Sequence, residues 1–186
     1  MRVISGKFKS RRLFFPKTFL TRPVTDRAKE TIFNVLGSLC QDANVLDLFS
    51  GSGSLGIEAL SRGANTVYFV ESARIATSCI KKNLEVIEME SVGTILETPV
   101  ELAIKKFQKM EKKFNLIFLD PPHNKGLIKN TLRQLDASDI VNLFGTIVIG
   151  HSNHESLPED LKTLCHQRSI KIGQTFVSFL TKKEPL

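Results

Sequence analysis

The chain has 186 residues, 41% hydrophobic and 24% charged, which is the composition of a globular domain long enough to bury a core. It has no apolar run near the roughly 18 residues of a membrane span, and its basic start lacks the apolar stretch of a signal peptide. The three cysteines are widely and irregularly spaced, which argues against a disulfide framework or a metal motif, so we expect no metal site and a reducing cytoplasm.

The positive charge of the chain is concentrated at one end. Residues 1–30 contain nine lysines and arginines against two acids, so this segment carries the whole formal net charge of +7 and the rest of the chain is neutral. Such a distribution is typical of a basic arm that binds a polyanion, joined to a neutral body. The alternative is a solvated basic end that only aids solubility.

Apolar and polar residues alternate over residues 2–15, with Gly6 near a turn, which predicts a short hairpin. Its packed side would carry four apolar residues: Val3, Phe8, Leu13 and Phe15. Its other side would present four basic residues to a nucleic acid: Lys7, Lys9, Arg11 and Arg12. Phe8 and Phe14 have rings that could stack on bases, although plain packing is the stronger expectation.

A helix is predicted next. The pair Thr25-Asp26 can cap a helix that runs to about Leu36 and ends at Gly37. Its apolar stripe would be formed by Ala28, Ile32, Val35 and Leu36. Its polar side would carry Arg27, Lys29 and Glu30.

The centre of the sequence is a predicted strand followed by a glycine-rich loop. The apolar run Val45–Phe49, broken only by Asp47, predicts a buried parallel strand. The run Gly51-Ser52-Gly53-Ser54-Leu55-Gly56 matches the pattern G-x-G-x-x-G, whose glycines let the backbone turn tightly beside a ligand. The helix that should follow ends at Arg62-Gly63.

A second acid follows at the distance expected in a nucleotide-binding fold. Glu71 lies 20 positions after Gly51, at the end of the predicted strand Thr66–Val70, where a carboxylate can accept hydrogen bonds from ribose hydroxyls. A glycine pattern between a strand and a helix, with this distal acid, predicts a nucleotide site. The alternative is a glycine-rich turn in an α/β protein that binds no ligand.

The remaining elements continue the alternation of helix and strand. We predict helices over residues 73–87, 100–107, 127–135 and 158–164, strands over 93–96, 114–119 and 146–149, and a final hairpin that pairs 169–172 with 175–180. This order predicts a parallel sheet with helices on both faces and one antiparallel strand. Ligands of such sheets bind beyond the carboxyl ends of the strands, where Asp47, Glu71 and Asp120 would all lie.

Three motifs together resemble a known family. The run from Asp47 to Gly53, the acid Glu71 and the sequence Asp120-Pro121-Pro122 resemble the class I methyltransferases that depend on S-adenosylmethionine (SAM). The segment Thr21–Arg27, with Glu30, makes the chain resemble more narrowly the bacterial RsmD-type enzymes, which methylate a guanine N2 in 16S ribosomal RNA. The resemblance covers nearly the whole chain.

This resemblance implies an α/β, Rossmann-like fold with a seven-stranded, mostly parallel sheet that has one antiparallel strand. A small N-terminal extension of hairpin and helix, residues 1–37, would contact RNA and help to close the cofactor pocket. Residues 38–186 would form the domain that binds SAM.

The resemblance also implies roles for single residues. Glu71 would hold the cofactor ribose, Gly51 and Gly53 would pass beside the methionine moiety, and Asp47 would lie near its amino group. Four further cofactor contacts are expected at Phe49, Ser52, Arg22 and Thr25. The catalytic group would be Asp120, Pro121, Pro122 and His123. In that group, the Asp120 carboxylate and the Pro121 carbonyl would accept hydrogen bonds from the guanine amine.

Two positions depart from the pattern of this family. His123 stands where an aromatic residue usually stacks on the target base; an imidazole can stack more weakly, and a surface histidine without a role is an equal alternative. Pro99 stands about where an acid or amide usually meets the adenine amine, so Glu97 or backbone groups would have to supply that contact.

The predicted function is methylation of a guanine N2 in 16S rRNA, or in an assembly intermediate of the small subunit, by in-line transfer to a flipped-out base. We expect a cytoplasmic monomer without membrane contact. A nicotinamide-dependent oxidoreductase is less favoured because Asp-Pro-Pro has no role in hydride transfer. A DNA adenine-N6 methyltransferase is less favoured because of the Arg-Pro segment and the small size. A catalytically silent RNA-binding protein that keeps the fold is the third alternative.

Overall fold

The computed structural model describes residues 1–15, 24–122 and 126–184, and strands alternate with helices along them. The strands are β1 (Asn44–Leu48), β2 (Thr66–Glu71), β3 (Gly93–Glu97), β4 (Phe114–Leu119), β5 (Val141–Ser152), β6 (Leu164–Ile172) and β7 (Thr175–Lys182). The helices are α1 (Asp26–Leu36), the 3-10 turn η1 (Gly37–Cys40), α2 (Ser54–Ser61), α3 (Arg74–Val86), α4 (Val100–Lys109) and α5 (Leu127–Ala137). No helix in these described segments is both long and apolar enough to cross a membrane.

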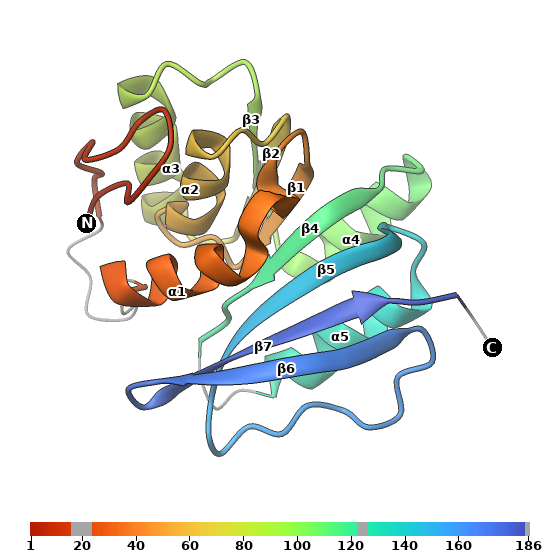
Figure 1. Ribbon diagram of the computed structural model, residues 1–186. Helices are drawn as coiled ribbons and strands as arrows, with labels where there is room; N and C mark the ends of the chain where they lie inside the picture. Colours follow the sequence, from red (N-terminus) through yellow and green to blue (C-terminus); the bar gives the residue numbers. More distant parts are fainter. Residues whose placement is uncertain (16–23, 123–125, 185–186) are drawn as a thin grey trace.

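The strands form one sheet in the order β3-β2-β1-β4-β5-β7-β6 (Figure 1). The pairings from β3 to β5 are parallel, and β7 runs antiparallel to both of its neighbours. This topology confirms the predicted Rossmann-like fold with one antiparallel strand. It also puts the carboxyl ends of β1, β2 and β4 next to one another, at the edge where the predicted site lies.

Each face of the sheet has its own apolar cluster and its own helices (Figure 1). On one face, α1, α2 and α3 contribute Phe33, Leu60 and Ile80 to the first cluster. On the other face, α4 and α5 contribute Phe107 and Leu132 to the second. All five side chains are at most 2% exposed, and burying each one contributes about 1.5–3 kcal/mol relative to leaving it in water.

The helix α1 begins and ends where the sequence predicts, but one residue predicted on its polar side is buried. Thr25 is its N-cap and accepts a hydrogen bond from the first turn at 3.2 Å, and Gly37 ends it at φ +53°. The prediction that Lys29 lies on the polar side is wrong, because Lys29 is 0% exposed. The reason is a tertiary contact: the equally buried Glu58 of α2 lies 3.8 Å from Lys29 Nζ.

The helix predicted over residues 158–164 is also wrong. Residues 153–163 form an irregular connection, and β6 begins directly after it. The Asp136 carboxylate, near the end of α5, accepts hydrogen bonds from the N–H groups of three successive residues, Lys162–Leu164, at 2.7, 2.8 and 3.0 Å. These bonds keep the chain extended where it enters the sheet, so tertiary contacts override the apolar spacing.

Residues 1–14, here called the N-terminal arm, fold back on themselves as a hairpin would. Only one isolated antiparallel bridge, between Arg2 and Arg12, joins its two sides. Val3 and Leu13 are 1% and 7% exposed and belong to the same apolar cluster as α1 and α2, as the predicted packed side requires. The division of the chain into domains at residue 37 stays a prediction.

Candidate functional site

Three neighbouring strands end at one level, and each end contributes a residue to the candidate site. The strand β1 pairs in register with β2 and with β4 up to its last residue. The next residues along the three strands are Phe49, Glu71 and Asp120, which therefore lie at the same carboxyl edge of the sheet. The structure thus brings together the residues that the alternation of elements places at this edge.

Glu71 fastens the glycine-rich loop to the sheet. Its Oε2 accepts a hydrogen bond from the Gly51 N–H at 2.9 Å, and its Oε1 accepts one from the Ala73 N–H at 2.8 Å. Gly51 has φ +54°, and a Cβ atom built there would meet no atom within 4 Å. The space above Gly51 is therefore open to a ligand, and the left-handed backbone favours glycine at this turn.

The other two glycines of the motif allow close packing. A Cβ atom at Gly53 would lie 3.2 Å from the Phe69 ring, and one at Gly56 would lie 2.4 Å from the same ring. Larger residues at these two positions would push α2 away from β2. The motif therefore combines one glycine beside open space with two that seat the helix on the sheet.

Asp47 is the buried acid of the site. It is 2% exposed, and its Oδ2 accepts a hydrogen bond from the Gly56 N–H at 3.0 Å. Burial, and to a smaller extent the nearby charges of Asp120 and Glu71, raises its pKa to about 8 in spite of the Gly56 hydrogen bond. Asp47 is therefore mostly protonated at neutral pH unless a positive group lies beside it.

A cavity of about 190 Å³ lies beside Glu71. Its lining residues are Phe49, Val70, Glu71, Ser72, Pro99, Val100 and Glu101. Phe49 has φ +58°, a left-handed conformation that is rare for a bulky side chain. This turn ends β1 one residue earlier than predicted, and Phe49 becomes part of the cavity wall.

Of the two residues in doubt for an adenine, Pro99 lines the cavity and Glu97 is not among its lining residues. Pro99 lines it as the N-cap of α4 and has no N–H to donate. The Glu97 carboxylate accepts a hydrogen bond from Thr77 Oγ1 at 2.6 Å. Glu101, in the first turn of α4, is the other acid that lines the cavity. The sequence alone did not point to Glu101, because an acid in a first helical turn is common.

Asp120 follows β4 directly and is half-buried, with Pro121 buried and Pro122 exposed behind it. The neighbouring strand β5 presents Gly150 to it. A Cβ atom at Gly150 would lie 2.3 Å from Asp120 Oδ1, so a larger residue there would displace the carboxylate. No local signal points to this role, since nothing near Gly150 in the sequence distinguishes it from any other glycine in a strand.

The other predicted cofactor contacts have structural partners of their own. Thr25 caps α1. Ser52 is buried, and its carbonyl accepts a hydrogen bond from Asn83 Nδ2 at 3.0 Å. Arg22 and His123 lie outside the described residues. The cofactor contacts of Thr25 and Ser52 stay predictions.

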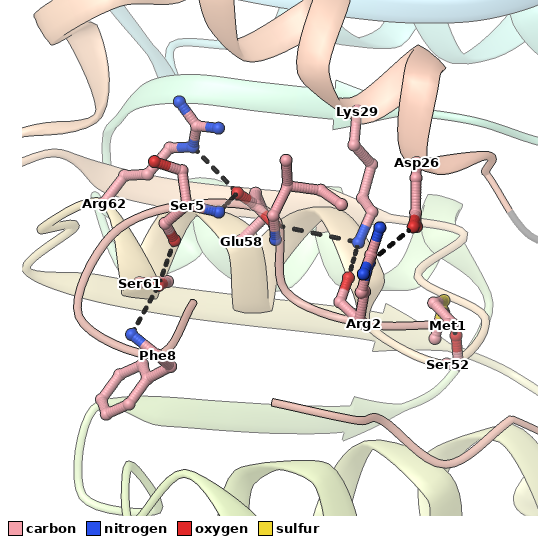
Figure 2. A network of polar contacts seen from close by, with 11 residues as sticks. Met1, Arg2, Ser5, Phe8, Asp26, Lys29, Ser52, Glu58, Ser61 and Arg62 are labelled. Carbon is pink, nitrogen blue, oxygen red and sulfur yellow. Dashed lines mark hydrogen bonds and ion pairs between the residues drawn. The ribbon is translucent and has the colours of Figure 1, made fainter. Parts of the chain in front are cut away.

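A buried carboxylate ties the N-terminal arm to α2 (Figure 2). Glu58 accepts three hydrogen bonds: from the Ile4 N–H at 2.8 Å, the Ser5 N–H at 3.0 Å and Arg62 Nε at 3.0 Å. Lys29 Nζ lies 3.8 Å away and donates to the Arg2 carbonyl. Burial lowers the pKa of Lys29, and the charge of Glu58 opposes that change.

The arm runs along the length of α2 (Figure 2). At one end the Lys7 N–H donates to the Ser61 carbonyl at 2.8 Å, and a Cβ atom at Gly6 would lie 1.9 Å from the same oxygen. At the other end Met1 Sδ lies 3.8 Å from Ser52 Oγ, beside the glycine-rich loop. The four basic residues predicted to contact nucleic acid are all exposed: Lys7, Lys9, Arg11 and Arg12.

Known proteins are similar to this chain in sequence and fold. The family model described as "Conserved hypothetical protein 95" matches residues 1–181. A Bacillus subtilis relative named "Putative rRNA methyltransferase YlbH" is 38% identical over 183 residues, which are 98% of this chain and 100% of the relative. The chain belongs to this family, the RsmD-like methyltransferases. The resemblance inferred from Asp47–Gly53, Glu71 and Asp120-Pro121-Pro122 is therefore confirmed at the level of the family.

Other members of the RsmD-like family extend the match. "Ribosomal RNA small subunit methyltransferase D" of Escherichia coli K12 is 35% identical over 136 residues, which cover 73% of this chain and 67% of that protein. A solved structure described as "Putative methyltransferase yhhF from Escherichia coli" has a TM-score of 0.83 at 28% identity and covers 98% of both chains.

Proposed function

We propose that this RsmD-like protein transfers a methyl group from SAM to N2 of a guanine in small-subunit rRNA, with the target base flipped out of its stack. The names of its relatives support a ribosomal RNA substrate. The observation that carries the chemical part is that Glu71 and Asp120 end the two strands that flank β1, with the glycine-rich loop and its open space between them.

The residues at the carboxyl edge fit SAM. Each oxygen of the Glu71 carboxylate accepts one backbone N–H and has a further lone pair for a ribose hydroxyl. The open space above Gly51 suits the methionine moiety. An amino group beside Asp47 would keep that carboxylate ionised at neutral pH. SAM bound in this way supplies an electrophilic methyl group, so the chain needs no nucleophile of its own.

Asp120 and Pro121 are assigned to the target amine. The exocyclic nitrogen of guanine is a weak nucleophile because its lone pair is delocalised into the ring. Two acceptors, the Asp120 carboxylate and the Pro121 carbonyl, would orient its N–H groups and turn the lone pair towards the methyl carbon. As the nitrogen bonds to the methyl carbon, the carbon–sulfur bond would break and S-adenosylhomocysteine would leave. The adjacent carboxylate would stabilise the positive charge that the nitrogen gains, and one N–H proton would then be lost to solvent.

The N-terminal arm is assigned to the RNA. Its basic side chains are exposed, and its backbone is fixed to α2 through Glu58 and Ser61. Fixed cations attract the phosphate backbone without reading its sequence. The target base has to leave its stack to reach Asp120, since this carboxylate is half-buried at the sheet edge.

The proposed function is tested by incubating the protein with methyl-labelled SAM and rRNA from cells that lack it, and then separating the nucleosides of the product. We expect label in N2-methylguanosine of the small-subunit RNA, and much less of it with an Asp120→Asn variant, whose side chain keeps one acceptor oxygen but no charge. Label in N6-methyladenosine of a DNA substrate would identify the DNA methyltransferase instead. RNA binding without any transfer would identify the catalytically silent protein.

A further inference from the structure

Phe14 is an exposed aromatic residue at the end of the N-terminal arm. Its side chain is 52% exposed, so the plain packing expected from the sequence is not what the structure has. Phe8, the other candidate for stacking, is half-buried and packs against the apolar core. Exposure alone does not mark a binding residue, because single apolar side chains are common on protein surfaces. Phe14 differs from them in how its backbone is held and in what surrounds its ring.

The backbone of Phe14 is clamped on both sides by one asparagine of α3. Its N–H donates to Asn83 Oδ1 at 2.6 Å, and its carbonyl accepts a hydrogen bond from Asn83 Nδ2 at 3.1 Å. Asn83 is 0% exposed, and its Nδ2 also donates to the Ser52 carbonyl of the glycine-rich loop at 3.0 Å. One buried side chain thus fixes the exposed ring relative to the loop beside the cofactor site.

A cation lies beside the ring. Lys82 Nζ is 5.9 Å from the centroid of Phe14, within the range of a cation–π contact, and Lys81 next to it is also exposed. An aromatic face next to lysines is the combination that holds single-stranded nucleic acids, because the ring stacks on a base while the cation meets the phosphate.

Phe14 lies near the end of α2 that is at the carboxyl edge of the sheet. Met1 and Ser52 mark one end of α2, at the carboxyl edge of the sheet, and Phe8 and Ser61 mark the other (Figure 2). The eight residues of α2 span about 12 Å at 1.5 Å per residue. The clamp to Ser52 therefore puts Phe14 at the reacting end, whereas Lys7 lies at the far end.

We propose that Phe14, held by Asn83 and flanked by Lys82, stacks on an unpaired base of the substrate RNA that lies next to the flipped target nucleotide. This inference rests on the proposed function, because it describes how the same RNA is held at the same edge. A fixed ring at this place would keep the strand open beside the target and would tolerate any base, since every base has a π face.

The test measures binding of a fluorescein-labelled, single-stranded RNA of 12 nucleotides and of its fully paired duplex, by anisotropy at several salt concentrations. Phe14→Ala and Phe14→Leu should weaken single-strand binding about 5- to 150-fold, the range that a stacking aromatic contributes, with an unchanged salt slope. Phe14→Tyr should bind like the wild type. Lys82→Ala should reduce the salt slope by about 0.7.

Matched controls separate the loss of stacking from the loss of RNA affinity that removing any exposed ring or charge would cause. Phe144→Ala removes a still more exposed ring, 68% against 52%, near the start of β5, and Lys105→Ala removes an exposed charge from α4; neither should change binding. The inference would be overturned if Phe14→Ala bound the single strand as tightly as Phe144→Ala. It would also be overturned if Phe14→Ala lost the same affinity for single strand and duplex, or if Phe14→Leu bound like the wild type. Failure of the wild type to bind or methylate RNA would instead overturn the proposed function.

Discussion

Gly150 of β5 and Asp120 after β4 are in such close contact that a Cβ atom on the glycine would lie 2.3 Å from Asp120 Oδ1. The contact follows from the parallel pairing of the two strands, which aligns the last residue of β4 with the residue before Gly150. The place of the proposed catalytic carboxylate is therefore set by a residue that takes no part in the chemistry.

Gly150→Ala should therefore lower the rate of methyl transfer without changing SAM affinity. Displacing a positioned group by about 1 Å can cost about 100-fold in rate, and a loss of at least 10-fold in kcat is expected. The measurement is a steady-state assay with labelled SAM, beside calorimetry of SAM binding. If the glycine acts through Asp120, Gly150→Ala combined with Asp120→Asn should be no slower than Asp120→Asn alone. Full activity of Gly150→Ala would contradict this positioning role.

Glu71→Ala should weaken SAM binding by about 10- to 100-fold, because hydrogen bonds to a charged acceptor contribute about 1.5–3 kcal/mol each. The readout is the dissociation constant from isothermal titration calorimetry. Glu159→Ala is the control, since Glu159 is an exposed acid in the connection of residues 153–163 and has no proposed contact with SAM. Equal losses in the two variants would mean that Glu71 has no special part in holding the ribose.

Asp47 should make the stability of the ligand-free chain depend on pH. Its pKa is about 8 in the folded chain, against an ordinary value of 3.8, so between about pH 4 and pH 8 the folded chain keeps a proton that the unfolded chain has released. The unfolded state then binds fewer protons, and the free energy of unfolding falls as the pH rises through this window.

Asp47→Asn keeps an oxygen for the Gly56 N–H and removes the ionisation. In the variant, the free energy of unfolding should not fall as the pH rises through this window. The variant should therefore be more stable than the wild type at pH 8.5 but not at pH 4. Urea titrations at the two pH values measure the difference. The same pH slope in both proteins would show that Asp47 does not titrate in this range.

Glu58→Gln should destabilise the fold by about 3–5 kcal/mol, because it leaves the buried Lys29 ammonium without its anion. Adding Lys29→Met to Glu58→Gln should recover part of that loss. Arg133→Ala is the control: its pair with Asp160 is half exposed or more on both sides, and its loss should cost at most about 1 kcal/mol. Denaturant unfolding gives the comparison, and an equal cost for both charge removals would argue against a buried pair.

Most elements could be predicted because local signals agree with the fold. Thr25 and Gly37 set the two ends of α1 through capping contacts with residues one turn away, and the apolar strands are recognisable without their partners. The two errors share a cause. The extended chain before β6 is held by Asp136, and Lys29 is buried against Glu58; both partners are distant in sequence. Helical spacing does put Lys29 on one face with Ile32, Phe33 and Leu36, but a lysine on a buried face is not expected without knowledge of its partner.

Some residues of the candidate site could likewise be predicted from the sequence and others could not. The placement of Asp47, Glu71 and Asp120 at one edge could be predicted because each lies near, at or directly after the end of a strand, and the topology of an α/β sheet brings strand ends together. Gly150 and Asn83 could not, since each matters only through the group that it faces across space. Their residue types carry no chemical signature of that role.

The central claim is that SAM lies along the carboxyl edge with Asp120 opposite its methyl group. The most direct measurement is a crystal structure with S-adenosylhomocysteine, the product of transfer. We predict its ribose hydroxyls on the Glu71 carboxylate, its amino acid end above Gly51 and its sulfur facing Asp120. Electron density for the ligand at any other edge, or an Asp120 carboxylate turned away from the sulfur, would contradict the account.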